Sequence, residues 1–181
     1  MGAIGMNEVM SIPTGFLVCD AMLKAAEVEL VSAGCVCAGK YFAVVSGEVA
    51  AVRASVEAGR EAAGGVLVDH LVIANVHEDV APAVMACAGT ENLSAVGVME
   101  TYSLCAAIYA ADAAAKAAEV RLLEVRLGRG LGGKSFVLLT GDVAAVKAAV
   151  EAAEALEETQ GLMGQSVVIP SPHPDLLRTI Q

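Results

Sequence analysis

Short apolar runs and longer alanine-rich stretches take turns along the chain, and their order predicts its secondary structure. Apolar runs such as 3–8 are typical of buried strands, whereas longer stretches of small residues such as 14–26 favour helices. The elements predicted in the first half are a strand over 3–8, a helix over 14–26, strands over 28–36 and 41–46, a helix that begins after Gly47 with Glu48 near its positive N-terminal end, and a strand over 66–74. This β-α-β-β-α-β order predicts an α+β fold of the ferredoxin-like, split βαβ type.

The second half of the chain repeats the first. The matched segments are Asp20–Leu30 with Asp112–Leu122 at an offset of 92, Gly39–Val52 with Gly133–Val146 at an offset of 94, and His77 with His173 at an offset of 96. Eight of eleven residues are identical in the first pair, and Asp, Lys, Gly and His keep their register, so shared alanine does not explain the match. We therefore predict two tandem domains, residues 1–90 and 91–181.

The second copy predicts the same elements, with two extra residues between Leu122 and Gly133. Its predicted elements are strands over 95–100, 120–127, 135–140 and 165–170, a helix over 105–118, and a helix that begins next to Asp142. A short helix is expected after His77 and again after His173.

Composition narrows the possible functions. Charged residues make up 18% of the chain and hydrophobic residues 56%, which excludes a disordered protein. The net charge of −10 makes nucleic acid a poor partner, because binding to it requires neutralised phosphates. Charges, glycines and prolines interrupt every long apolar stretch, and the start shows no basic region before an apolar one, so we expect neither a membrane span nor a secretory signal. Five cysteines in such a chain indicate a reducing compartment and free thiols.

Three motifs, present in both copies, resemble a known family. They are Asp-x-x-x-Lys-Ala-Ala-x-Val, a Gly-Lys pair whose strand runs into Gly-Asp/Glu-Val-Ala-Ala-Val, and Val-Ile-x-x-x-His. Together they resemble the bacterial microcompartment (BMC) shell domain in its unpermuted form. The resemblance implies a tandem-domain shell protein whose trimer imitates the six-fold tile of single-domain relatives. It also implies a location in the microcompartment shell within the cytoplasm, with further copies and other shell proteins as partners.

Cys37 is the residue with the most specific chemistry. The run Cys37-Ala38-Gly39-Lys40 resembles the propanediol-utilisation type of tandem shell protein, in which a cysteine before Gly-Lys flanks the central opening and three copies hold an iron–sulfur cluster. The resemblance implies a [4Fe–4S] cluster on the three-fold axis, with water or an outside ligand at the fourth iron, and a redox enzyme as a further partner. Ala38 stands where that type has proline, and the loop is one residue longer, which adds Cys35. The alternative is that Cys37 is a small apolar residue at a strand end.

Two glycine-rich turns, 34–39 and 128–133, admit two interpretations. They are either strand connections that need positive φ, or the lining of a pore. A dinucleotide loop or a P-loop does not fit, because a strand and not a helix follows the second turn. The resemblance places around the pore Gly34, Cys35, Val36, Cys37, Ala38, Gly39, Gly128, Arg129, Gly130, Leu131 and Gly132. Three copies of Arg129 would favour anions there, whereas the alternative is an exposed arginine paired with a glutamate.

The remaining polar residues have structural interpretations. Lys24 and Lys116 suit helix C-termini, and the family resemblance places them at the tile edge. His77, His173, Glu8 and Glu100 occur in both copies, which favours structural roles. We expect Cys19, Cys87 and Cys105 to fill the core, and Cys35 to face the same side as Cys37 if its strand continues that far.

Enzyme chemistry has no support in the residue pattern, since no nucleophile and base recur in a helpful context. Two rival functions remain open at this point. One is a duplicated ferredoxin-like sensor of the ACT type, which binds small molecules between its copies. The other is a redox subunit that uses Cys37.

Overall fold

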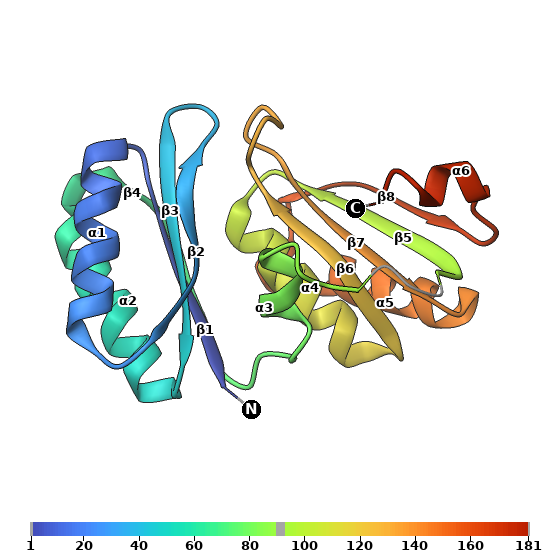
Figure 1. Cartoon of the computed structure of the whole chain (residues 1–181), viewed down its shortest axis with the longest axis horizontal. Coiled ribbons are helices and arrows are strands. Elements are labelled where there is room, and N and C mark those ends of the chain that lie inside the picture. Colours follow the sequence, from blue (N-terminus) through green and yellow to red (C-terminus); the bar gives the residue numbers. More distant parts are fainter. Residues whose placement is uncertain (1, 90–92, 181) are drawn as a thin grey trace. The chain divides into compact units, whose positions relative to one another are not determined.

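The computed structural model describes residues 2–89 and 93–180 (Figure 1). The first domain contains β1 (Ala3–Val9), α1 (Ile12–Ala25), β2 (Glu29–Val36), β3 (Lys40–Gly47), α2 (Val49–Ala63), a short 3-10 turn (Gly64–Val66) and β4 (Leu67–Ile73). The second contains β5 (Ala95–Thr101), α4 (Leu104–Ala117), β6 (Val120–Leu127), β7 (Ser135–Gly141), α5 (Val143–Ala155), a 3-10 turn (Glu157–Thr159) and β8 (Met163–Ile169). Short helices follow the two repeated histidines, α3 (Val80–Val84) and α6 (Pro174–Leu177).

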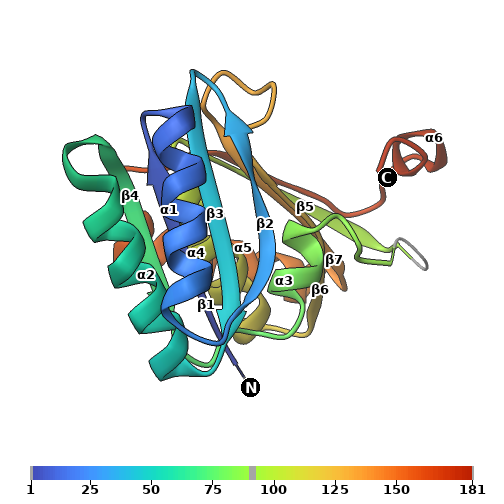
Figure 2. The ribbon, with the colours of Figure 1, turned by 60° about the vertical axis from the view of Figure 1, so that its left-hand side comes forward.

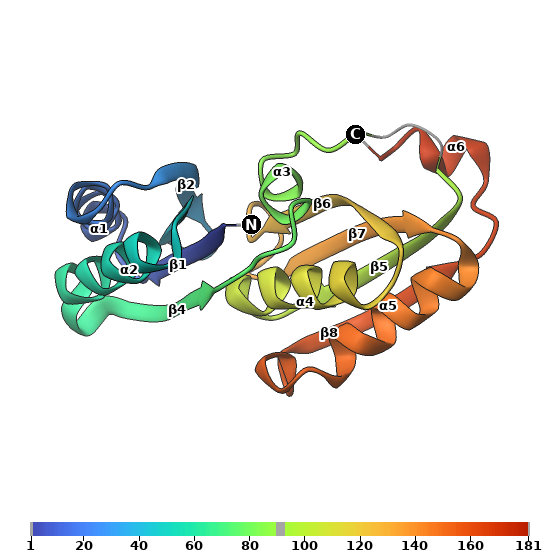
Figure 3. The ribbon, with the colours of Figure 1, turned by 90° about the horizontal axis from the view of Figure 1, so that it is seen from below.

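Each domain is a four-stranded antiparallel sheet with two helices against it. The strand orders are β2-β3-β1-β4 and β6-β7-β5-β8, so the central strands are the first and third of each copy. In the first domain α1 and α2 lie side by side against the sheet (Figure 2). In the second domain α4 and α5 occupy the equivalent positions (Figure 3). The predicted α+β, split βαβ fold is confirmed in both copies.

Small residues let the helices of the first domain approach the sheet closely. A Cβ atom on Gly15 of α1 would lie 2.3 Å from the Cβ atom of Tyr41 on β3. The Ser55 hydroxyl on α2 donates to the Met22 carbonyl on α1 over 2.9 Å, which joins the two helices. The core beneath them is formed by Val9, Val18, Met22, Tyr41, Ala43, Val45, Val52 and Val56.

Two helices begin slightly before their predicted starts, because the sequence interpretation missed their N-caps. The Ser11 hydroxyl accepts from the Thr14 N–H over 3.4 Å, and the Ser103 hydroxyl accepts from the Ala106 N–H over 3.3 Å. A serine in this position satisfies a backbone donor that the helix itself leaves unpaired. The helices that follow Glu48 and Asp142 begin as predicted.

The chain folds as two compact units that exchange short segments. One unit comprises residues up to Val76 together with Gly128–Gly133, and the other comprises His77–Leu127 with the chain from Lys134 onward. The division that we predict from the sequence, between residues 90 and 91, lies outside the described residues. None of the helices in the described ranges is both long and apolar enough to cross a bilayer.

Candidate functional site at the first glycine-rich turn

Cys37 lies in the tight turn that connects β2 to β3. The last register pairs of this hairpin are Cys35 with Tyr41 and Val36 with Lys40, so the strand ends before Cys37. The strand alternation that would place Cys35 and Cys37 on the same side therefore ends at Val36, one residue before Cys37. Cys35 is exposed and Cys37 is half-buried. The hairpin places one thiol in the solvent and the other within the turn.

The second glycine-rich turn packs against this hairpin. Residues Gly128–Gly133 connect β6 to β7 in the sequence but belong to the compact unit of the first domain. The backbone N–H of Cys37 donates to the Gly128 carbonyl over 3.2 Å. The structure thus brings together the two turns that the sequence singles out. Positive φ at Gly39 and Gly130 confirms that both turns need glycine, as the simpler interpretation predicted.

Backbone N–H groups of the second turn face the Cys37 thiol. The N–H of Gly130 lowers the pKa of this thiol most, and those of Gly132, Leu131 and Gly133 act in the same direction, while partial burial opposes them. The thiolate is the form of cysteine that binds metals. Hydrogen-bond donors that stabilise this form therefore make Cys37 a better metal ligand. Cys19 shows the contrast, because burial and then Asp20 raise the pKa of its thiol.

Arg129 folds back over the first domain. Its guanidinium Nη2 donates to the Ala33 carbonyl over 3.4 Å, and its Cζ lies 5.9 Å from the centre of the Phe42 ring. A Cβ on Gly34 would lie 2.6 Å from Nη2, so this strand glycine makes room for the arginine. Among the residues that the structure describes, its partners are this carbonyl and this ring, not the glutamate of our alternative interpretation.

The remaining residues predicted for the pore divide by exposure. Ala38, Gly39, Gly130 and Gly132 are exposed, and Leu131 is half-buried. Val36 and Gly128 are buried within the chain, because Val36 ends β2 and Gly128 holds the Cys37 backbone. The exposed members are therefore the ones available to line an opening.

The lysine after each glycine-rich turn pairs with a glutamate of the central strand. Lys40 forms an ion pair with the buried Glu8 in the first domain. Lys134 Nζ lies 2.8 Å from Glu100 Oε1 in the second, and this hydrogen bond raises the pKa of Lys134. The structural role predicted for the two glutamates is confirmed, since they hold the strand that leaves each turn.

The two lysines predicted at the tile edge lie in the last turns of α1 and α4. Lys24 Nζ is 2.7 Å from Asp20 Oδ2, and Lys116 Nζ is 2.6 Å from Asp112 Oδ2. Both ammonium groups retain access to solvent. Their role at a tile edge stays a prediction.

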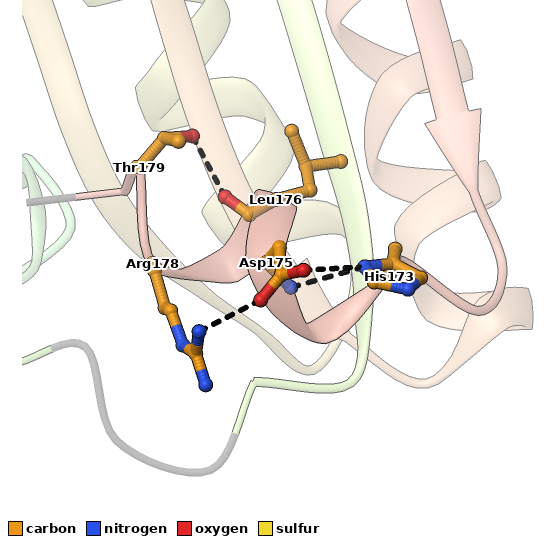
Figure 4. A network of polar contacts seen from close by, with 5 residues as sticks. All are labelled: His173, Asp175, Leu176, Arg178 and Thr179. Atoms are coloured by element: carbon orange, nitrogen blue, oxygen red, sulfur yellow. Dashed lines mark hydrogen bonds and ion pairs between the residues drawn. The ribbon is translucent and has the colours of Figure 1, made fainter.

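Each repeated histidine makes a local hydrogen bond that starts a short helix. The Nδ1 atom of His173 accepts from the Asp175 N–H over 3.2 Å, and Arg178 pairs with Asp175 at 2.8 Å (Figure 4). The Nδ1 atom of His77 accepts from the Asp79 N–H over 3.3 Å in the same way. These contacts give the histidines the structural function expected of them.

One cysteine prediction is wrong. Cys19 and Cys105 are buried, as expected of core residues, but Cys87 is exposed, with its thiol 3.4 Å from the Met85 carbonyl. The reason is that α3 is only five residues long and ends at Val84, so no helix carries Cys87 into the core.

The part of the chain that the structure describes brings together too few donors for a metal centre. Within the described ranges, no three His, Cys, Asp or Glu side chains come together in a way that could hold a metal ion. Cys37 contributes one thiolate, whereas an iron–sulfur cluster usually takes four. Any cluster at this turn therefore needs thiolates from several copies of the chain.

Comparison with known proteins identifies the family. The profile described as "BMC domain" matches residues 3–76 and 95–172. The chain belongs to the BMC domain family. It carries two BMC domains in tandem, as the repeated motifs predicted.

Two relatives of this BMC protein are shell proteins. It is 40% identical over 176 residues to the bacterial microcompartment shell protein PduT of Citrobacter freundii, covering 97% of this chain and 96% of that protein. The shell protein EutM of Salmonella typhimurium is 44% identical over 85 residues, 46% of this chain and 85% of EutM, so it matches a single BMC domain.

A solved structure supports the tandem fold. A microcompartments protein from Desulfitobacterium hafniense superimposes with a TM-score of 0.94 at 47% identity, covering 98% of this chain and 99% of that one. The expected resemblance to tandem shell proteins of the PduT type is confirmed.

Proposed function

We propose that the chain is a structural tile of a bacterial microcompartment shell, located in that shell and assembled with other shell proteins. The tandem match to the BMC domain over residues 3–76 and 95–172 carries this proposal. The shell proteins among its relatives, one of them 40% identical over almost the full length, support the same role and not an enzyme. The family match also favours a tile over a duplicated sensor of the ACT type.

The proposed assembly is a closed ring of three chains. Three copies of an 18.3 kDa chain form a particle of about 55 kDa that presents six domains around one axis. Cyclic closure brings equivalent residues of the copies together on that axis. The two glycine-rich turns, packed together in each chain, are the segments we place around the central opening.

At that opening we propose a [4Fe–4S] cluster held by Cys37 from each of three copies. The donor set fits this group, because the thiol is half-buried in a glycine turn and faces four backbone N–H groups that favour its thiolate form. When bound, the cluster would supply one-electron transfer, with Cys37 of each chain as its protein ligand. The N–H groups from Gly130 to Gly133 hold the thiolate, and the Cys37–Gly128 hydrogen bond orients its backbone.

Without a cluster, the same opening serves as a passage for small metabolites. Arg129 is exposed, and three copies would place positive charge there in a chain whose net charge is −10. Rings of arginine favour anions. Small anions are therefore the substrates we propose for such a passage.

Anaerobic reconstitution with iron and sulfide tests the cluster. We expect brown protein with about four iron atoms per trimer and an EPR signal after reduction. Cys37→Ser should abolish the colour and keep the trimer, because the domain cores do not include this residue. Cys35→Ser should have a smaller effect, and Cys87→Ser serves as the matched control, since Cys87 is an exposed cysteine outside both turns. Colourless wild-type protein would refute the cluster and leave the tile.

Light scattering after size-exclusion chromatography, combined with electron microscopy, tests the tile. The expected result is a trimer that associates further into flat layers. A monomer in solution would refute the shell assembly. Discrete particles that bind a small molecule and never form layers would favour the sensor.

A further inference from the structure

The two copies of the repeat differ at one strand position that lies opposite a phenylalanine. In the second domain Arg126 on β6 pairs in register with Phe136 on β7. In the first domain Gly34 on β2 pairs in register with Phe42 on β3. Residues directly opposite one another in an antiparallel pair place their side chains on the same face of the sheet. The first domain therefore has a glycine at the position where the second domain has an arginine beside the ring.

In the second domain this arginine lies over the phenylalanine of its own sheet. The Cζ atom of Arg126 lies 5.3 Å from the centre of the Phe136 ring, and its Nε donates to Glu124 Oε1 over 2.5 Å. The face of an aromatic ring attracts a guanidinium electrostatically. Two contacts within one sheet thus fix Arg126.

In the first domain the arginine over the ring comes from the second glycine-rich turn. The Cζ atom of Arg129 lies 5.9 Å from the centre of the Phe42 ring, and its Nη2 donates to the Ala33 carbonyl over 3.4 Å. A Cβ atom on Gly34 would lie only 2.6 Å from Nη2. The guanidinium of Arg129 therefore occupies the space that a side chain at Gly34 would need, and it takes the place that Arg126 has in the second domain.

The turn that carries Arg129 is also the turn that contacts Cys37. Gly128 precedes Arg129, and its carbonyl accepts from the Cys37 N–H over 3.2 Å. The N–H groups that face the Cys37 thiol follow directly, from Gly130 to Gly133. Four of the six residues in this turn are glycines, which lose more conformational freedom than other residues when they are ordered. A side chain that anchors such a turn has a large effect on the position of its backbone.

We propose that Arg129 is a latch that fastens the second glycine-rich turn to the first domain and thereby positions the backbone groups of this turn at Cys37. Gly34 provides the space for the guanidinium, and the Phe42 ring and the Ala33 carbonyl hold it there. Arg129 is a positioning residue, because it acts on Cys37 through the backbone of the turn. The value of the latch for a cluster rests on the proposed function of Cys37, whereas the latch itself does not.

The unlike residues of the two copies give the latch a direction. Arg126 fills in the second domain the space that Gly34 leaves open in the first. The first glycine-rich turn, residues 34–39, contains no arginine that could enter a neighbouring domain. The turn that supplies the N–H groups is therefore always that of the second domain, and the thiol is always that of the first.

Hydrogen exchange of the iron-free protein, followed by mass spectrometry, tests the latch. Arg129→Ala should make the Cys37 amide exchange about tenfold faster, as expected for the loss of a hydrogen bond to a charged group. Arg126→Ala is the matched control, because it removes an arginine from a phenylalanine ring of the second domain and should leave the Cys37 amide protected. Circular dichroism verifies that both variants are folded. Unchanged exchange in Arg129→Ala, or equal acceleration in both variants, would overturn the proposal.

A double variant separates the latch from the cover over Phe42. Ser32 and Gly34 are the counterparts of Glu124 and Arg126 at an offset of 92, so Ser32→Glu with Gly34→Arg copies the ion pair of the second domain. The arginine introduced at position 34 would cover Phe42 and exclude Arg129. The Cys37 amide should then exchange as fast as in Arg129→Ala, while the free energy of unfolding in urea stays near that of the wild type. Wild-type exchange in the double variant would overturn the proposal.

Reconstitution with iron and sulfide distinguishes the latch from the cluster. If the wild type is brown, the visible absorbance of Arg129→Ala should fade several-fold faster in air than that of Arg126→Ala, because the backbone donors are no longer held at the thiolate. Colourless wild-type protein whose Cys37 amide loses protection in Arg129→Ala would refute the cluster and support the latch. Brown Arg129→Ala protein with wild-type exchange and fading would overturn the latch and leave the cluster.

Discussion

Gly59 on α2 provides a sharp test of how closely the first domain is packed. A Cβ atom at this position would lie 2.2 Å from Asn7 Nδ2 and 2.7 Å from Met22 Cγ. Asn7 cannot move away freely, because its Nδ2 donates to the Val56 carbonyl over 3.0 Å inside the core. The substitution Gly59→Ala therefore forces either a steric clash or the loss of a buried hydrogen bond.

The opposing contributions to stability can be compared. Overpacking a core costs about 1–3 kcal/mol, and leaving a buried donor or acceptor without its partner costs about 1–3 kcal/mol. Alanine is favoured over glycine within a helix by about 1 kcal/mol. Because one of these two costs applies and the better helix propensity of alanine offsets part of it, we expect Gly59→Ala to lower the free energy of unfolding by about 1 kcal/mol.

The second domain shows how the same position accepts alanine. The counterpart of Gly59 at an offset of 94 is Ala153, which is fully buried. The counterparts of Asn7 and Met22 at an offset of 92 are Met99 and Ala114. The smaller Ala114 leaves room where Met22 fills the space, and Met99 has no buried amide to satisfy.

Urea unfolding at one fixed protein concentration measures the effect. Gly65→Ala is the control, because a Cβ atom there meets no atom within 4 Å. A triple variant with Asn7→Met, Met22→Ala and Gly59→Ala copies the second domain and should recover most of the lost stability. Wild-type stability in the Gly59→Ala variant would refute the reasoning. It would show that Asn7 can move away from the added methyl group without a loss in the free energy of unfolding.

Three further predictions concern the surface and the turns. Lys24→Ala and Lys116→Ala should each reduce layers in electron microscopy while light scattering still shows the trimer, because these side chains reach solvent. Arg129→Glu should weaken the binding of small anions, measured by calorimetry, because it reverses the charge at the opening. Cys37 should be alkylated by iodoacetamide at lower pH in the folded protein than in urea-unfolded protein, because the backbone N–H groups lower the pKa of its thiol in the folded state.

Each of these predictions has a contrary result. Unchanged layers in both lysine variants would remove the tile-edge role and leave the trimer. Equal anion binding by wild type and Arg129→Glu would eliminate an anion passage. Coincident pH profiles for Cys37 in the folded and the unfolded protein, resolved by peptide mass spectrometry, would show that the second turn does not stabilise the thiolate.

Much of the fold follows from local patterns in the sequence. Alternation of apolar runs with alanine-rich stretches predicted every strand and helix of both domains. Such a pattern is informative because strands and helices each bury their apolar residues at a characteristic spacing. The first residues of α1 and α4 differ from the predicted ones, because Ser11 and Ser103 cap these helices. A cap is a single hydrogen bond and leaves no periodic signal in the sequence. Cys87 was misplaced because alanine around it resembles a buried helix, whereas α3 ends three residues earlier.

The candidate site was only partly predictable. Cys37 and both glycine-rich turns stand out in the sequence, and the structure packs these turns together. Which groups meet the thiol did not follow, because they are backbone N–H groups from Gly130 to Gly133, more than ninety residues away along the chain. The pattern of side chains in a sequence does not reveal a contact that is made by main-chain N–H groups.

The two glycine-rich turns differ in their residues, and this difference sets how many thiols the proposed ring of three chains would contain. A ring of six identical domains presents each turn residue six times, so a cysteine in that turn would give six thiols. Fusing two unlike copies halves the number, because the short turn brings Cys37 and the longer one brings glycine N–H groups and Arg129 in its place. In the proposed ring of three chains, three thiols would alternate with three donor loops, a count that identical domains in a six-membered ring cannot provide.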